Sequence, residues 1–220
     1  MALVVHSLGA YASYPDSRIP WRRSDYDINK LVKSLKGEPL KGYANLRDVD
    51  RVMRRIVPDD RDPALQYFAA WAARRLATLN IGRFVLVPVP SSSSISYNSR
   101  GAPFDMACAI QQRMGRGVKV ERWLRFAEKM IPSHDGGSRD VRVLAASMKV
   151  AAACEHGIRV VLVDDVKTTG SHCKASAQRL RACDMNVETV VVAATTVWEQ
   201  QRNPFLMDPE DLEGERTDSF

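Results

Sequence analysis

The feature that most constrains this chain is the segment Val160–His172, which reads VVLVDDVKTTGSH. Its run of aliphatic residues is typical of a parallel strand that is covered on both faces. Two adjacent carboxylates follow, Asp164 and Asp165, and then a loop of small residues that leads into a helical pattern. Ligands of open α/β sheets bind at the carboxyl ends of strands. The segment therefore predicts an α/β fold with a ligand site at residues 164–171.

The residue types after this strand suit a phosphorylated sugar. A small-residue loop that opens a helix presents backbone N–H groups to an anion. The candidate phosphate-binding residues are Thr168, Thr169, Gly170 and Ser171. Two neighbouring carboxylates repel each other unless hydroxyl donors or a cation such as Mg²⁺ lie beside them. A ribose with a phosphate would satisfy both parts of the segment.

Hydrophobic patterns place other elements along the chain. Further strands are expected at 84–87, 118–124 and 187–195, and helices at 25–37, 46–56, 62–79, 103–114, 172–183 and somewhere within 139–154. Strands that alternate with helices favour a mainly parallel sheet flanked by helices. We expect a mainly helical N-terminal region or hood at 1–82, a core at 83–198, and an acidic, disordered or partner-bound tail at 199–220.

The segment at 160–172 resembles the motif with which type I phosphoribosyltransferases bind 5-phosphoribosyl-1-pyrophosphate (PRPP). The order of elements, with Pro-Val-Pro-Ser after the strand at 84–87 and Ser-Arg-Gly before the next helix, is most similar to the ComF-type, competence-associated branch. The chain lacks the N-terminal four-cysteine zinc module of that branch. The resemblance implies a type I phosphoribosyltransferase fold and an enzyme that uses PRPP and Mg²⁺. Such an enzyme transfers the phosphoribosyl group to a nitrogenous acceptor and releases pyrophosphate.

The resemblance also implies roles for individual residues. Asp164 and Asp165 would be the catalytic pair on the ribose hydroxyls and would meet Mg²⁺ largely through PRPP, and residues 168–171 would hold the 5-phosphate. The implied pyrophosphate contacts are Pro90, Ser91, Ser92 and Arg100, although a run of serines is also typical of a flexible linker. A flap at 127–140 would contribute Lys129 and His134, and Trp21 and Tyr26 would lie near the acceptor. Lys167, where the family varies, is expected to be solvated.

Composition leaves several partners open. The net charge is +6 although the last twenty residues are acidic, so the rest of the chain is strongly basic and suits a polyanion. Nucleic acid therefore stays open as a partner, with Arg51, Arg54 and Arg55 as a candidate basic face. A homodimer is common in the family. The N-terminus has neither a signal-peptide pattern nor a spanning run, so we expect a cytoplasmic protein without a membrane partner.

Other functional classes fit the sequence less well. A nucleotide hydrolase with this acid pair would need a GxxxxGK[ST] loop, which the chain lacks. A response-regulator receiver would need most of its sheet after the acid pair, where few residues remain. The main alternative is a non-catalytic PRPP-binding regulatory or scaffold protein, linked to nucleic-acid handling as in the ComF branch, because the motif reports binding rather than turnover.

Overall fold

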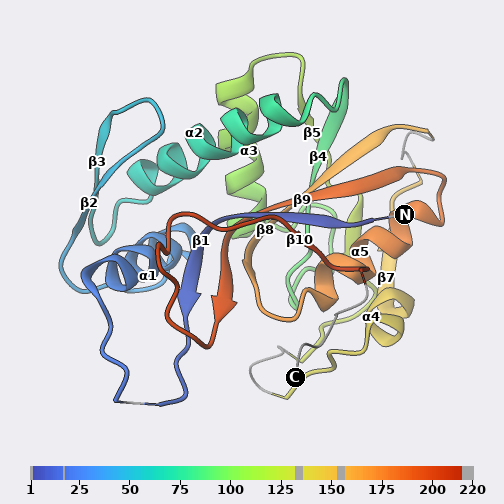
Figure 1. Ribbon diagram of the computed structural model, residues 1–220. Coiled ribbons are helices and arrows are strands. Elements are labelled where there is room, and N and C mark those ends of the chain that lie inside the picture. The colour runs from blue at the N-terminus through green and yellow to red at the C-terminus, as the bar shows by residue number, and fades with distance from the viewer. Residues whose placement is uncertain (1, 17, 132–135, 153–156, 215–220) are drawn as a thin grey trace.

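The computed structural model describes residues 2–16, 18–131, 136–152 and 157–214. Its centre is a six-stranded sheet in the order β10 (Glu210–Asp211), β1 (Val4–Ala12), β9 (Asn186–Val197), β8 (Arg159–Lys167), β4 (Phe84–Pro88) and β5 (Lys119–Val120). Within this sheet β1, β9, β8, β4 and β5 each pair in parallel with the next, and only β10 is antiparallel to its neighbour β1. The chain is thus an α/β protein with a mainly parallel sheet, as expected (Figure 1).

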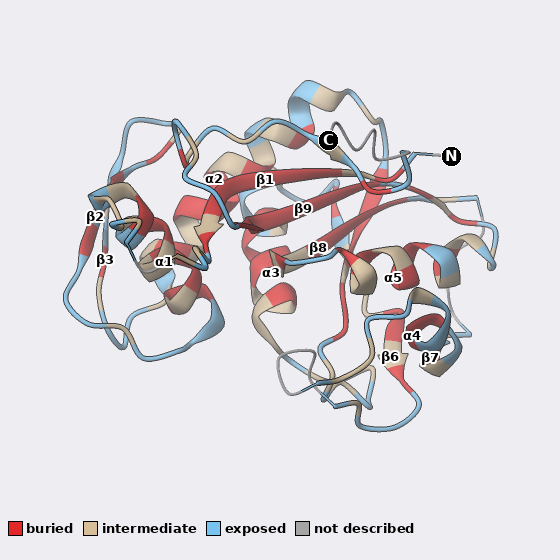
Figure 2. Cartoon of the chain, turned by 60° about the horizontal axis from the view of Figure 1, so that its bottom comes forward, coloured by how far each residue is buried: buried red, intermediate tan, exposed pale blue. Residues whose placement is uncertain are grey.

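Helices cover both faces of this sheet. On one face lie α1 (Arg23–Lys36), α2 (Asp62–Leu79) and α3 (Ala102–Met114), whose apolar side chains form one core with alternate residues of the strands. On the other face lies α5 (Ser171–Arg181), and α4 (Val141–Ser147) packs against α5 from outside. Figure 2 shows the central strands as largely buried between these layers. Burial on both faces explains why the strands read as continuous aliphatic runs.

The predicted helix at 25–37 is present as α1. Its residues Ile28, Leu31 and Leu35 are buried against the sheet at helical spacing. Gly37 ends the helix in a left-handed conformation with a φ of 71°, which glycine adopts without steric cost. This ending places Lys36 and Glu38 beside the carboxyl ends of the strands, where they line the cleft described below.

Two predictions for the N-terminal region are wrong. Residues 46–56 form no helix but an antiparallel hairpin of β2 (Ala44–Arg47) and β3 (Met53–Ile56). Leu46 and Ile56 are buried there, whereas Met53 is 54% exposed, so the helical spacing of these apolar residues was coincidental. The expectation of a mainly helical first 80 residues also missed β1, which pairs with β9 inside the central sheet.

The expected disorder of the acidic tail is wrong for its described part. Residues 210–211 form β10 on the edge of β1, and Leu212 is buried in the core on the α5 face. The buried side chain of Leu212 and two ion pairs, Lys167–Glu210 and Arg181–Glu213, hold this segment in place although its composition is acidic. A separate two-stranded antiparallel sheet, β6 (Leu124–Phe126) with β7 (Met148–Val150), lies beside α4 (Figure 2). Within the described residues no helix is long and apolar enough to cross a membrane.

Candidate ligand-binding site

A cleft of about 660 Å³ lies at the carboxyl edge of the parallel strands. The ends of β1, β4, β8 and β9 reach it, together with the end of α1 and the starts of α3 and α5. Parallel pairing explains this convergence, because Pro88 at the end of β4 lies opposite Val163, next to the acid pair. Sequence segments that are far apart therefore meet at one edge. The predicted residues that line the cleft are Pro90, Ser91, Ser92, Asp164, Asp165, Thr168, Thr169, Gly170 and Ser171.

The acid pair is held by its own backbone. One carboxylate oxygen of Asp164 accepts the N–H of Asp165 at 2.9 Å, and the other accepts the thiol of Cys173 at 3.6 Å. Burial, followed by the charge of Asp165, raises the pKa of Asp164 well above its ordinary value. Burial also raises the pKa of Asp165, against the opposing charge of Lys36. Such a pair binds a proton, a hydroxyl donor or a cation more readily than an isolated surface acid does.

The loop after β8 forms the start of α5. Gly170 precedes the helix with a φ of 76°, and the hydroxyls of Thr169 and Ser171 lie 2.9 Å apart. A Cβ atom at Gly170 would lie only 2.9 Å from a methyl carbon of Leu212, so both the backbone angle and the space require glycine. The helix start brings free backbone N–H groups and the positive end of the helix dipole to the cleft. This geometry suits a phosphate.

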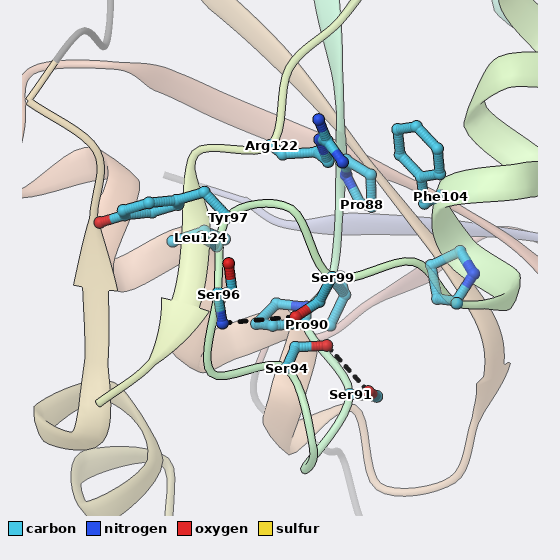
Figure 3. A pocket seen from close by; sticks show the side chains of 13 residues that line it. Pro88, Pro90, Ser91, Ser94, Ser96, Tyr97, Ser99, Phe104, Arg122 and Leu124 are labelled. Carbon is cyan, nitrogen blue, oxygen red and sulfur yellow. Dashed lines mark hydrogen bonds between the residues drawn. The ribbon is translucent and has the colours of Figure 1, made fainter. Parts of the chain in front are cut away.

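The serine-rich loop after β4 is structured rather than a free linker. Figure 3 shows its side chains around a small pocket next to the cleft, with the hydroxyl of Ser91 2.9 Å from that of Ser94. The segment that leaves β6 runs beside this loop, because Phe126 N–H donates to the Ser94 carbonyl and Met130 N–H to the Ser92 carbonyl, each at 2.8 Å. The first residues of the predicted flap are therefore attached to the predicted pyrophosphate loop.

Several cleft residues were not predicted as functional. Tyr11, Val32 and Thr196 line it, as do Lys36 and Glu38 at the end of α1. The ammonium of Lys36 lies 2.5 Å from the carboxylate of Glu38. Burial lowers the pKa of Lys36, but the bond to Glu38 and the charge of Asp165 outweigh it and raise that pKa overall. In the sequence these residues look like the solvated last turn of an amphipathic helix, so no signal distinguished them.

His172 also lines the cleft, next to the phosphate loop. Its ring lies 5.9 Å from that of Phe126, measured between centroids. Burial lowers the pKa of His172, and the charge of Asp165 only partly opposes this effect. The imidazole therefore favours its neutral form, which both donates and accepts a hydrogen bond.

The structure does not bring every predicted residue to the cleft. Arg100 is exposed and its guanidinium lies over the Phe104 ring, 5.9 Å from the centroid. Lys129 is exposed beside the serine-rich loop, and His134 lies outside the described residues. The rings of Trp21 and Tyr26 contact each other, with centroids 5.2 Å apart and planes tilted by 50°, and both residues are absent from the described cleft lining.

Two further basic features differ from expectation. Lys167 is not solvated, because its side chain is only 5% exposed and forms an ion pair with Glu210. The three arginines of the predicted basic face lie on the β2–β3 hairpin rather than on a helix. Arg54 binds Asp48 at 3.0 Å, and Arg55 lies over the Tyr43 ring at 4.5 Å. They therefore do not form one helical face.

The residues of the cleft fit a magnesium ion that is held mainly by its ligand. Among the described residues there is no group of three or more His, Cys, Asp or Glu side chains placed to hold a metal. Mg²⁺ is commonly bound through one or two carboxylates while substrate phosphates and water supply its other oxygens. Asp164 and Asp165 provide such a carboxylate pair, with burial and mutual repulsion favouring a cation beside them.

No protein-family model and no curated protein matches this chain. Solved structures that resemble it include the adenine phosphoribosyltransferase of Trypanosoma brucei in complex with AMP, pyrophosphate and ribose-5-phosphate, with a TM-score of 0.44 and 15% identity over 79% of this chain and 82% of that chain. That of Leishmania donovani has a TM-score of 0.41 and 13% identity over 92% and 94% of the two chains. These low values give no support to an activity, which has to be inferred from this chain's own residues.

Proposed function

We propose that this chain is a phosphoribosyltransferase that binds PRPP and Mg²⁺. It transfers the phosphoribosyl group to a nitrogenous acceptor and releases pyrophosphate. The observation that carries the proposal is that one cleft is lined by the acid pair, the phosphate loop and the serine-rich loop. These segments come from different parts of the sequence, and each suits one part of PRPP.

The ligand would lie along the carboxyl edge of the sheet. The 5-phosphate would occupy the start of α5 at residues 168–171, where N–H groups and hydroxyls converge. The ribose hydroxyls would donate to Asp164 and Asp165. The pyrophosphate would lie against Pro90, Ser91 and Ser92, whose loop follows the neighbouring strand β4. The acceptor would then approach from the wall formed by Tyr11, Val32, Lys36 and Glu38.

The charges of the cleft explain why Mg²⁺ would be needed. The lysines among the described cleft residues are Lys36 and Lys167, and each is already paired with a glutamate. A pyrophosphate that enters beside two carboxylates would therefore be repelled without an added cation. When bound, Mg²⁺ would neutralise the pyrophosphate and stabilise its departure.

The protein itself would contribute positioning and charge. In the transfer the bond between ribose C1 and the pyrophosphate oxygen breaks, and the pyrophosphate leaves with the electron pair. The acceptor nitrogen bonds to C1 and gives up its proton to water. Ribose C1 becomes positively charged along this path, and the carboxylates of Asp164 and Asp165 stabilise that charge. Fixing both ends of the sugar orients C1 toward the acceptor wall.

The test is acceptor-dependent release of pyrophosphate from PRPP in the presence of Mg²⁺. Purines, pyrimidines and small amines would be screened with the unmodified chain and with the Asp164→Asn/Asp165→Asn variant. Release that one acceptor stimulates, and that the double variant lacks, is the expected result. Binding of PRPP without turnover with any acceptor would instead favour a regulatory or scaffold protein.

A further inference from the structure

One lysine of the phosphate loop is engaged by the C-terminal segment. Lys167 directly precedes Thr168, is one of the cleft residues, and has a side chain that is only 5% exposed. A lysine so buried needs an anionic partner. That partner is Glu210 in β10, whose own side chain is 42% exposed. The pair therefore joins the ligand site to a segment that follows it by about forty residues.

The glutamate is held in place by a set of contacts along residues 203–214, here called the C-terminal strap. In Figure 1 the strap runs along β1 toward α5. The Pro204 carbonyl accepts the N–H of Ala10 at 2.8 Å, and Leu212 N–H donates to the Leu3 carbonyl at 2.9 Å. At its end Glu213 binds Arg181 of α5 at 2.6 Å. The strap is therefore part of the folded structure, and its contacts with β1 and α5 hold Glu210 opposite Lys167.

The strap also contacts the phosphate loop directly. Leu212 is buried and fills the space that a side chain at position 170 would need. The backbone turn at Gly170 and the ammonium of Lys167 are thus both in contact with the strap. If the phosphate loop moves when a ligand binds, the contacts of Glu210 and Leu212 with that loop would change.

We propose that Lys167 is a further phosphate-binding residue, shared between Glu210 in the free protein and the ligand phosphate in the complex. This inference rests on the proposed function. A phosphate dianion carries more charge than a carboxylate, and it would lie in a loop whose N–H groups also favour it. Because Glu210 is partly exposed, water can solvate its carboxylate when the ammonium of Lys167 turns toward the ligand. Breaking this ion pair therefore costs little free energy.

Competition for one ammonium makes the strap and the phosphate antagonists. Glu210 weakens phosphate binding because the ligand must displace it, and by linkage the ligand weakens the attachment of the strap to the same degree. Removing the charge of Glu210 should therefore strengthen phosphate binding. This effect should disappear when Lys167 is also removed, because the glutamate would act only through that lysine.

The experiment is a calorimetric titration of the full chain with ribose 5-phosphate, for the unmodified protein, Glu210→Gln, Lys167→Met and the double variant. We expect Glu210→Gln to bind about fivefold more tightly and Lys167→Met about tenfold more weakly, with the double variant equal to Lys167→Met. The matched control is Glu213→Gln, which removes an acid and an ion pair from the same strap. Its partner Arg181 lies at the far end of α5, about 15 Å from the loop by helix rise, so affinity should stay within about twofold.

Two results would overturn the proposal while leaving the proposed function intact. One is binding by the unmodified chain that Glu210→Gln leaves unchanged or weakens. The other is a gain in ribose 5-phosphate affinity from Glu210→Gln that persists in the Lys167→Met background. Such a gain would come only from removing the long-range repulsion between the Glu210 carboxylate and the phosphate. If Lys167→Met fails to fold, the comparison of Glu210→Gln with Glu213→Gln still decides the first point. No binding of ribose 5-phosphate or PRPP by the unmodified chain would overturn the proposed function itself.

Discussion

The substitution Asp164→Asn should stabilise the fold while removing ligand binding. Burial and the neighbouring carboxylate raise the pKa of Asp164 well above its ordinary value. Each pKa unit of such a rise costs the native state about 1.4 kcal/mol at a pH above the raised pKa. Asparagine removes this cost and keeps an oxygen that can accept the N–H of Asp165. After allowing for a weaker acceptor, we expect a net gain of about 1 kcal/mol, or about 2–4 °C in Tm for a chain of this size.

The pH dependence gives this prediction its sign. A carboxyl group with a raised pKa binds its proton more tightly in the native state, so native stability falls as pH rises from the ordinary carboxyl range through the raised pKa. The Tm advantage of Asp164→Asn should therefore be larger near pH 7 than near pH 4. Asp211→Asn is the control of opposite sign, since its carboxylate accepts the N–H groups of Glu213 and Leu3 and its pKa is lowered. Thermal unfolding checks both, and a Tm of Asp164→Asn at or below that of the unmodified chain at neutral pH would refute the reasoning.

Three further variants test the sheet and the loops around the site. Burial and the charge of Arg75 lower the pKa of His6 to about 4, so stability should fall by up to about 3 kcal/mol as pH drops from 6.5 toward 4, and His6→Gln should flatten that slope in urea unfolding. Gly170→Ala should lower the free energy of unfolding by about 1–3 kcal/mol and weaken ribose 5-phosphate binding about tenfold in calorimetry, because its Cβ would meet Leu212. Arg100→Ala should leave PRPP affinity within about twofold, because the guanidinium lies outside the cleft lining.

Each of these variants has a result that would count against its explanation. An unchanged acid slope in His6→Gln would mean that another group titrates in that range. A Gly170→Ala protein with unchanged stability would show that the strap does not restrict the loop. A large loss of PRPP affinity in Arg100→Ala would show that the loop before α3 moves to the ligand on binding.

The strands that were predicted correctly are those whose run of aliphatic residues follows directly from burial of the strand on both faces. Strands β4, β8 and β9 lie between helices on both faces, so they read as continuous aliphatic runs, and the acid pair with its small-residue loop follows β8 directly. The pairing of β4 with β8 then brings the serine-rich loop to the acids. The centre of the candidate site was therefore visible in the sequence.

The missed elements depend on tertiary partners. In β1 the polar residues His6 and Ser7 interrupt the apolar run, but the structure gives them Arg75 and Thr195 as hydrogen-bond partners. The tail has the composition of a disordered segment, and one buried leucine with a few ion pairs orders it. The cleft wall at Lys36 and Glu38 was missed because a charged pair at the end of a helix looks solvated unless the facing strands are known.

The most direct test of the central claim is calorimetric titration of the full chain with PRPP in the presence and absence of Mg²⁺. It would be repeated with the Asp164→Asn/Asp165→Asn variant after thermal unfolding has shown that the variant folds. The account predicts Mg²⁺-dependent binding with a Kd on the order of micromolar, as a well-formed polar site can supply, and loss of that binding in the variant. Equal PRPP affinity in the folded double variant, or no binding by the unmodified chain, would contradict it.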